Sequence, residues 1–245
     1  MAEAYAALRG LGLGDGCDMS VFKGFTGRLY RKFLHKYYRN DLWLDLCLRA
    51  KADTLDYIEA HMLAAQVLED RLDLLRFALS RAPESGLVLE FGVEKGASIR
   101  WLAQHTPRTV HGFDSFRGLP NDWRGTKEAA GKFDMAGKLP KVPGNVQLHV
   151  GWFNETIPPF LAENNGPIAL LHVDCDIYES TVTIFQNLET RLGPGTVIVF
   201  DEYYNYPGWR LHEHKAFAEW LAATGRTYRY LGYAAEKGHV AVVLT

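Results

Sequence analysis

Short apolar runs alternate with helix-patterned stretches along the last two thirds of the chain. Seven runs rich in β-branched and aromatic residues predict strands over 87–91, 109–113, 146–150, 168–173, 196–200, 228–233 and 239–244. Amphipathic stretches predict helices near 97–105, 155–163, 179–191 and 211–224. Strand–helix alternation with nearly continuous apolar strands is typical of a parallel sheet that is covered on both faces.

The last two predicted strands are joined by residues 234–238, a loop too short to hold a crossover helix. These strands must therefore pair antiparallel as a hairpin. We predict an α/β fold with a Rossmann-like, mostly parallel sheet of seven strands that ends in a C-terminal antiparallel hairpin. This fold is expected to occupy residues 83–245. The polar connection 112–145 is long, which usually marks a functional loop or lid.

Residues 1–82 are predicted to form an N-terminal loop and helical extension. Residues 1–25 are rich in glycine, whereas apolar residues from Leu55 to Leu79 recur every three or four positions and predict one helix over 53–80, with Asp53 as its N-cap. Basic and aromatic side chains interleave over 28–39. That stretch suits either single-stranded RNA or packing against the domain or a second subunit. We expect any homo-oligomer to form through these N-terminal helices.

Composition narrows the class of protein. The chain has 245 residues, 47% of them apolar and 23% charged, and a formal net charge of -2, which gives no indication of nucleic acid or an anionic membrane as partner. Cys17, Cys47 and Cys175 lie far apart, so we expect no disulfide framework, no zinc site and a reducing cytoplasm. We see neither a signal peptide nor a run of about 18 apolar residues, so no membrane partner is expected.

A glycine-rich turn follows the first strand of this domain, over residues 90–98. Gly92 and Gly96 allow a ligand to approach the backbone closely. A dinucleotide fingerprint needs a glycine where Glu94 stands, and a pyrophosphate would meet this carboxylate. The turn therefore favours S-adenosylmethionine, whose carboxylate suits Ser98 and the helix N-terminus and whose ammonium group suits Glu90. An ordinary strand–turn–helix with incidental glycines is the alternative.

Asp114 ends the second strand, where a carboxylate typically accepts the hydroxyls of a bound ribose. The alternative is that Asp114 merely caps a helix. Its place after the glycine-rich turn favours nucleoside binding.

Two pairs of carboxylates follow neighbouring apolar strands. Asp174 and Asp176 come after 168–173, and Asp201 and Glu202 come after 196–200. The carboxyl ends of parallel strands meet at one edge of a sheet, so these acids should converge and repel one another. A divalent cation with oxygen ligands, such as Mg²⁺, would explain that crowding and would acidify a substrate hydroxyl. Alternatively, these acids cap the following helices.

Five motifs in order carry a family resemblance over about residues 55–220. The chain resembles the macrocin O-methyltransferase family, whose members methylate hydroxyls of antibiotic sugars and related natural products, and more distantly catechol O-methyltransferase. The predicted strand arrangement is the one that class I methyltransferases use. The motifs are residues 90–98, 112–120, 151–158, 174–181 and 194–203.

The resemblance implies a role for individual residues. Asp174, Asp201 and Glu202 match metal-ligand positions, although the family usually has a second aspartate where Glu202 stands, and Asp174 and Asp176 form the catalytic pair, with Asp176 as general base. The implied S-adenosylmethionine contacts are Glu90, Gly92, Gly96, Ser98, Asp114 and Ser115, with Phe153 and Asn154 near the adenine.

These observations predict an S-adenosylmethionine-dependent methyltransferase, assisted by Mg²⁺ or another divalent cation, that acts on a hydroxyl of a small molecule such as a sugar, natural product or phenol. Metal-independent or RNA-directed methyl transfer on the same fold remains the alternative, although nucleic acid is not the expected partner. A nicotinamide-dependent oxidoreductase and a non-catalytic cofactor-binding protein remain further alternatives. His212 and His214 are reserve candidates for a base, and His172 is expected to pack in the core.

Overall fold

The structure is a computed structural model that describes residues 41–245. The chain divides into two compact units, residues 1–45 and 46–245. The predicted loop over 1–25 and the basic aromatic stretch 28–39 lie outside the described residues. Among residues 41–245, no helix combines the length and apolar character needed to cross a bilayer.

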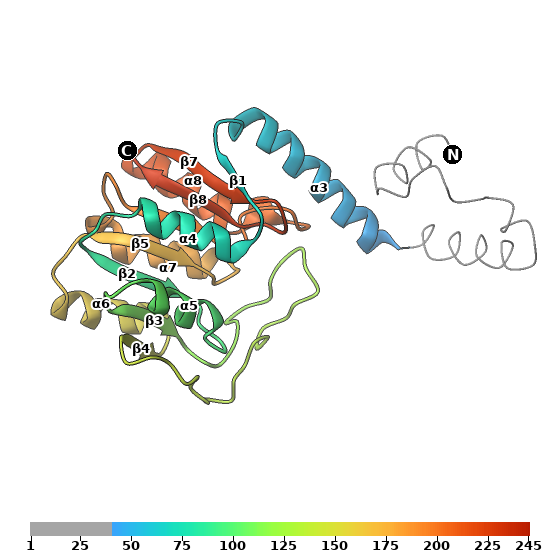
Figure 1. Ribbon diagram of the computed structural model, residues 1–245. Helices are drawn as coiled ribbons and strands as arrows, with labels where there is room; N and C mark the ends of the chain where they lie inside the picture. The colour runs from blue at the N-terminus through green and yellow to red at the C-terminus, as the bar shows by residue number, and fades with distance from the viewer. Residues whose placement is uncertain (1–40) are drawn as a thin grey trace, which may run out of the picture. The chain divides into compact units, whose positions relative to one another are not determined.

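Unit 46–245 contains an eight-stranded sheet with helices on both faces (Figure 1). The helices are α3 (Leu42–His61, which begins just before the unit), α4 (Arg71–Arg81), α5 (Ala97–His105), α6 (Phe153–Glu163), α7 (Tyr178–Leu188) and α8 (Glu213–Thr224), with short 3₁₀ turns η2 (Glu189–Arg191) and η3 (Trp209–Leu211). The strands are β1 (Gln66–Leu68), β2 (Leu87–Phe91), β3 (Val110–Asp114), β4 (Val146–Val150), β5 (Ile168–Val173), β6 (Val197–Phe200), β7 (Tyr228–Ala234) and β8 (Val240–Leu244).

The strand order is β1-β7-β8-β6-β5-β2-β3-β4. All pairs are parallel except those of β8, which pairs antiparallel with β6 and β7. The predicted mostly parallel sheet with a C-terminal hairpin is confirmed. The count of seven strands is one too few, because β1 adds to the outer edge of β7.

The single helix predicted over 53–80 is wrong. Helix α3 ends at His61, β1 follows, and α4 begins at Arg71. Asp53 lies inside α3, and Asp70 is the N-cap of α4, accepting the amides of Leu72 and Asp73 at 2.8 and 2.9 Å. The spacing of apolar residues over 53–80 is compatible with a helix throughout. Residues 66–68 instead form backbone hydrogen bonds with the open edge of β7.

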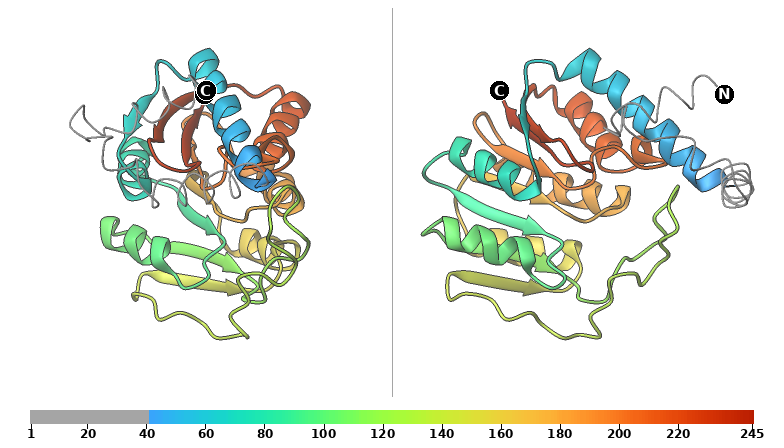
Figure 2. Two further views of the ribbon diagram at one scale, coloured as in Figure 1. Left: turned by 90° about the vertical axis from the view of Figure 1, so that its right-hand side faces the viewer. Right: turned by 45° about the vertical axis from the view of Figure 1, so that its right-hand side comes forward.

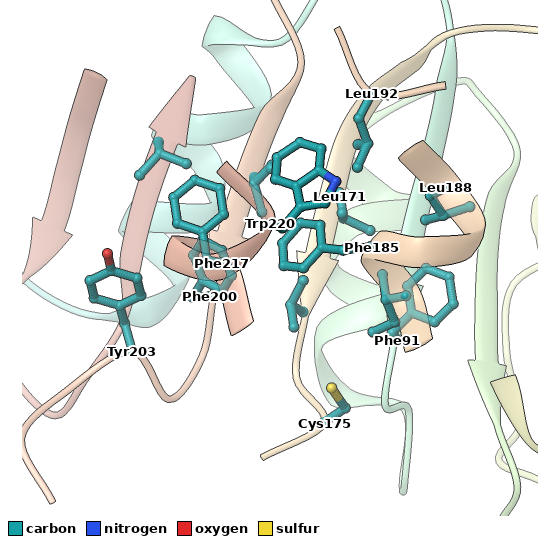
Figure 3. Packing of buried hydrophobic residues seen from close by; sticks show 14 of the residues in the cluster. Phe91, Leu171, Cys175, Phe185, Leu188, Leu192, Phe200, Tyr203, Phe217 and Trp220 are labelled. Atoms are coloured by element: carbon teal, nitrogen blue, oxygen red, sulfur yellow. The ribbon is translucent and has the colours of Figure 1, made fainter. Parts of the chain in front are cut away.

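Alternate side chains along the strands point to opposite faces of the sheet, and an apolar core lies on each face. Leu74, Ile99 and Leu102 of α4 and α5 pack against Val88 and Leu170 on one face. Leu89, Leu171 and Ile198 point to the other face, which α6, α7 and α8 cover (Figure 2). Figure 3 shows the aromatic centre of that second core, where Phe185 of α7 stacks on Trp220 of α8 at a centroid distance of 4.8 Å. This double packing explains why β2 and β5 are apolar except for Glu90 and His172.

The chain reverses its direction of travel across the sheet between β2 and β5. From β2 the strands proceed to β3 and β4 on one side, whereas β5 and β6 lie on the other. In open α/β sheets, ligands bind in the crevice at the carboxyl ends of the strands flanking such a reversal. The loops after β2, β3, β5 and β6 therefore define where a site can form.

Two histidines on the neighbouring strands β3 and β4 make the stability of the protein depend on pH. His111 of β3 is 5% exposed, and its Nδ1 lies 3.2 Å from Nε2 of His149 on β4. Burial, and then the neighbouring His149, lowers the pKa of His111 to about 4. The unfolded chain takes up this proton near the ordinary pKa of about 6.5. The contribution of His111 to the free energy of unfolding is therefore fully present above that pH and is lost as the pH falls toward 4.

We expect lowering the pH from 7.5 to 5 to cost the wild type about 1–2 kcal/mol more free energy of unfolding than His111→Gln, since the variant lacks this proton uptake. Urea denaturation at both pH values measures the difference. His105→Gln, which removes an exposed histidine, should behave like the wild type; equal losses in all three proteins would contradict the assignment.

Candidate active site

A cavity of about 660 Å³ opens at the carboxyl ends of β2, β3, β5 and β6. This volume is in the range of small-molecule sites. Most of the predicted site residues form its wall, namely Gly92, Ser98, Asp114, Ser115, Phe153, Asn154, Asp174, Asp176, Asp201 and Glu202. Glu90 and Gly96 are not among its lining residues in the described part of the chain.

Gly92 brings the turn after β2 against the end of β5. Its φ is +92°, and a Cβ atom there would lie 1.7 Å from the carbonyl oxygen of Asp174. No side chain fits in that space, so glycine is required on both conformational and steric grounds. The turn therefore forms part of the cavity wall, between the part near Asp114 and the part near Asp174.

Asp114 holds this turn in shape. Its Oδ2 accepts the amides of Val93 and Glu94, each at 2.8 Å, and its Oδ1 accepts the amide of Phe116 at 2.7 Å. Oδ2 already accepts two amides, whereas Oδ1 accepts one and has a further lone pair for a ligand hydroxyl. The two turn amides are already engaged, so they are not free to cradle a pyrophosphate.

Glu90 is fully buried beneath the cavity. Ser98 Oγ donates to its Oε1 at 2.9 Å, and Nδ1 of His172 lies 2.9 Å from its Oε2. Ser98 separates Glu90 from the cavity, and Gly96 serves as the left-handed N-cap of α5. The predicted contacts of Glu90 and Gly96 with the cofactor stay predictions, and for Glu90 such a contact would pass through Ser98 or water.

The acids after β5 and β6 converge as predicted, and a residue that the sequence analysis missed lies between them. Arg71 Nη2 is 2.6 Å from Asp174 Oδ2, and Arg71 Nε is 2.7 Å from Asp201 Oδ1. One ligand atom each from His172, Asp174 and Asp201 lie within 4.8 Å of one another. Glu202 is not part of this trio.

Histidines complete the surroundings of Asp201. His239 Nδ1 lies 3.2 Å, and His172 Nε2 3.6 Å, from Asp201 Oδ1. Burial would raise the pKa of Asp201, but His172, His239 and Arg71 hold it well below its usual range. Burial alone would lower the pKa of His172, but its interactions with Asp201 and Glu90 raise it to about 9. His172 is fully buried, as expected of a core residue, but it also links Glu90 and Asp201 through its two ring nitrogens.

The other acids of the rim are less compensated. Burial and the charge of Asp201 raise the pKa of Asp174. Burial, followed by Asp201 and Asp174, raises the pKa of Glu202 to about 8. Behind them Glu213 is fully buried and accepts the amide of Glu202 at 3.1 Å. The rim as a whole would gain from a further cation.

Asp176 has a strained backbone. Its φ is +65°, and the amide of Ile177 donates to the carbonyl of Cys175 at 2.7 Å, which makes Asp176 the centre of a γ-turn. Such a turn with positive φ is rare and costly, and strain of this kind clusters at functional sites. Burial, and then the charge of Asp174, raises the pKa of the Asp176 carboxyl well above its usual range.

The donor set fits a divalent cation in chemistry, since carboxylate oxygens are the ligands that Mg²⁺ prefers. Asp201 Oδ1 is buried and has no aligned hydrogen-bond partner in the described part of the chain, and its present contacts are with the cationic or titratable groups of Arg71, His239 and His172. Asp174 and Asp201 are the ligands that the geometry supports best, with Glu202 beside them. Arg71 must leave these oxygens for an ion to bind.

The long connection after β3 covers part of the cavity. Leu119, Asn121 and Trp123 line it, and Trp123 packs edge-on against Tyr206 at 5.3 Å. His212 Nε2 lies 2.7 Å from the carbonyl oxygen of Arg124, which ties this connection to the segment before α8. His214 instead lies 3.2 Å from the hydroxyl of Tyr57. Neither histidine lines the cavity, so the geometry does not support either as a base.

The sheet order and the site together define a class I methyltransferase fold. Residues 89–203 match the family model described as a methyltransferase domain. The chain is also 28% identical to 8-demethyl-8-(2,3-dimethoxy-α-L-rhamnosyl)-tetracenomycin-C 4′-O-methyltransferase of Streptomyces olivaceus, over 54% of this chain and 60% of that protein. The predicted resemblance to O-methyltransferases of the macrocin type is thereby confirmed. The match leaves two fifths of that relative uncovered.

Two solved structures share the fold. The calicheamicin methyltransferase CalS11 is 24% identical, with a TM-score of 0.55, and covers 94% of this chain and 98% of its own. The O-methyltransferase NovP is 21% identical, with a TM-score of 0.50, and covers 71% of this chain and 78% of its own. At this identity the likeness shows the fold alone.

We expect Gly92→Ala to lower the free energy of unfolding by at least about 3 kcal/mol, because it combines left-handed strain with overlap against the backbone of Asp174. Gly131→Ala is the matched control, since Gly131 has φ +81° and nothing within 4 Å of its Cβ position. It should cost about 1–2 kcal/mol, the strain alone. Equal losses in chemical denaturation would refute the steric argument.

Proposed function

We propose that this protein transfers the methyl group of S-adenosylmethionine to a hydroxyl of a small molecule. One observation carries the proposal: a single cavity is lined both by Asp114, a carboxylate placed after β3 where it could accept ribose hydroxyls, and by the strained, buried Asp176. The methyltransferase domain matched over 89–203 includes both residues. The cofactor supplies an electrophilic methyl group on a sulfonium.

The cofactor half of the cavity suits S-adenosylmethionine rather than a nicotinamide dinucleotide. Asp114 would accept the ribose hydroxyls, and Phe153 and Asn154 at the start of α6 would lie beside the adenine. Ser98 and the N-terminal end of α5 suit the carboxylate of the amino acid portion. The engaged amides of Val93 and Glu94 argue against a pyrophosphate.

The acceptor half supports a polar, ring-shaped substrate. Trp123 offers an apolar face, and Asn121, Glu179 and Ser180 offer hydrogen-bonding groups on the same wall. The tetracenomycin relative is named for a rhamnosyl 4′-O-methyl transfer, and CalS11 is named for calicheamicin. We infer that the acceptor is a sugar hydroxyl on a natural product.

Asp176 would remove the proton of that hydroxyl. Because its pKa is raised, its ionised form is a stronger base than an exposed carboxylate, and it lines the cavity together with Asp174. Proton removal by a positioned base typically contributes about 10²–10⁴-fold to the rate. Loop 115–145 would exclude water while the oxygen is held in line with the methyl group.

A divalent cation on Asp174 and Asp201, with Glu202 nearby, belongs to the same proposal. When bound, such an ion would lower the pKa of the acceptor hydroxyl and hold its oxygen. The carboxylate oxygens of Asp174 and Asp201, which lie within 4.8 Å of one another and of a ring nitrogen of His172, support it. The chain's own contribution is to hold these carboxylates close together at the ends of β5 and β6.

Titration with S-adenosylhomocysteine and a methyl-transfer assay on a panel of deoxysugar glycosides and phenols test the activity. We expect Asp176→Asn to lower kcat about 100-fold or more with little change in S-adenosylhomocysteine affinity, because it removes the base and leaves the cofactor half intact. Asp134→Asn, which alters an exposed loop carboxylate, is the control. Absence of cofactor binding, or full activity of Asp176→Asn, would contradict the proposal.

Removal of divalent ions tests the metal role separately. We expect chelation to lower methyl transfer at least tenfold and added Mg²⁺ to restore it, since the hydroxyl then loses its acidifying partner. Binding of S-adenosylhomocysteine should be unchanged. Undiminished turnover after complete chelation would overturn the metal role and leave methyl transfer standing.

A further inference from the structure

Arg71 occupies an unusual position for a cation. It is the first residue of α4, directly after the N-cap Asp70. The N-terminus of a helix carries a partial positive charge, so a guanidinium there is disfavoured unless another interaction holds it. Many other residue types are suitable at the first position of a helix. The reason for an arginine must therefore lie in what its side chain contacts.

Those contacts are the two best-supported metal ligands. The guanidinium bridges Asp174 Oδ2 and Asp201 Oδ1 at 2.6 and 2.7 Å. Its side chain is 32% exposed and lines the cavity, so it has open space beside it. Asp174 follows β5 and Asp201 follows β6, and Arg71 joins them from α4.

We propose that Arg71 is a resident cation that competes with a divalent ion for Asp174 and Asp201. The inference rests on the metal site of the proposed function and extends it. An ion bound to both carboxylates would need the oxygens that Arg71 contacts, and it would repel the guanidinium at close range. Ion binding and the Arg71 bridge therefore exclude one another.

The geometry of the bridge suits displacement. Arg71 Nε and Asp201 Oδ1 are in close contact, yet neither has an aligned hydrogen-bond partner within residues 41–245. An ion-pair contact without that alignment is easier to exchange than a bidentate fork, in which two parallel bonds hold the guanidinium. With the bridge in place, the repulsion between Asp174 and Asp201 is offset in the ion-free protein, so the fold does not depend on the metal.

Binding of Mn²⁺ alone, without cofactor or acceptor, tests this competition by titration calorimetry and by the loss of the free Mn²⁺ resonance. We expect Arg71→Gln to bind Mn²⁺ at least tenfold more tightly than the wild type. Adding Asp201→Asn to Arg71→Gln should abolish the gain. Because no methyl transfer is measured, failure of the proposed activity would not affect this result.

Arg76→Gln is the matched control, because Arg76 is on the same helix and pairs with Asp73 on the exposed surface. It removes the same charge and should leave Mn²⁺ affinity within twofold of the wild type. If Arg71→Gln does not fold, as judged by near-ultraviolet circular dichroism, Arg71→Lys replaces it, since one ammonium bridges both acids less well than a guanidinium. Unchanged or weaker Mn²⁺ binding in the folded variant, or no binding in any protein at millimolar Mn²⁺, would overturn the competition.

Discussion

Repulsion among buried carboxylates is the constraint around which the site is arranged. Asp174, Asp176, Asp201 and Glu202 follow two adjacent parallel strands, so their backbone positions are set by the sheet and they cannot move apart. Basic side chains contact these acids: Arg71 from α4, His172 from β5 and His239 beside β8. Where such contacts are close, as at Asp201, they lower the pKa of the acid; at Glu202, burial and the neighbouring acids raise the pKa.

The same sheet order joins this acid rim to the cofactor side. β2 is central, with β3 on one side and β5 on the other, so the turn at Gly92 is in contact with both. The amides of Val93 and Glu94 in this turn donate to Asp114, and Gly92 packs directly on the carbonyl of Asp174. The residues proposed for binding and those proposed for chemistry are therefore linked through one short stretch of backbone, and beneath it Glu90 and His172 are paired across β2 and β5.

Much of this arrangement could be read from the chain. The strands from 87 onward were predicted almost to the residue because each is an apolar run bounded by turn residues, and the hairpin followed from the length of its loop. The sequence predicted four of the acids that line the cavity because each lies at or just after the end of such a run: Asp114, Asp174, Asp176 and Asp201. Arg71 was missed because it fell inside a long helix-compatible pattern, although Asp70 before it is a cap signal. His172 was missed because a histidine in an apolar strand looks like a core residue until its cross-strand partner Glu90 is known.

The amino-acid sequence by itself determined the class of fold, the edge of the sheet where the cavity opens and most of the polar residues gathered there, because these follow from local periodicity and from the order of motifs. Tertiary structure decided the rest. It ended α3 at His61 so that β1 could pair with β7, it turned Arg71 toward two acids more than 100 positions away, and it buried Glu90 out of the cavity. Such outcomes depend on hydrogen bonds and charges contributed by distant segments, and no local pattern contains them.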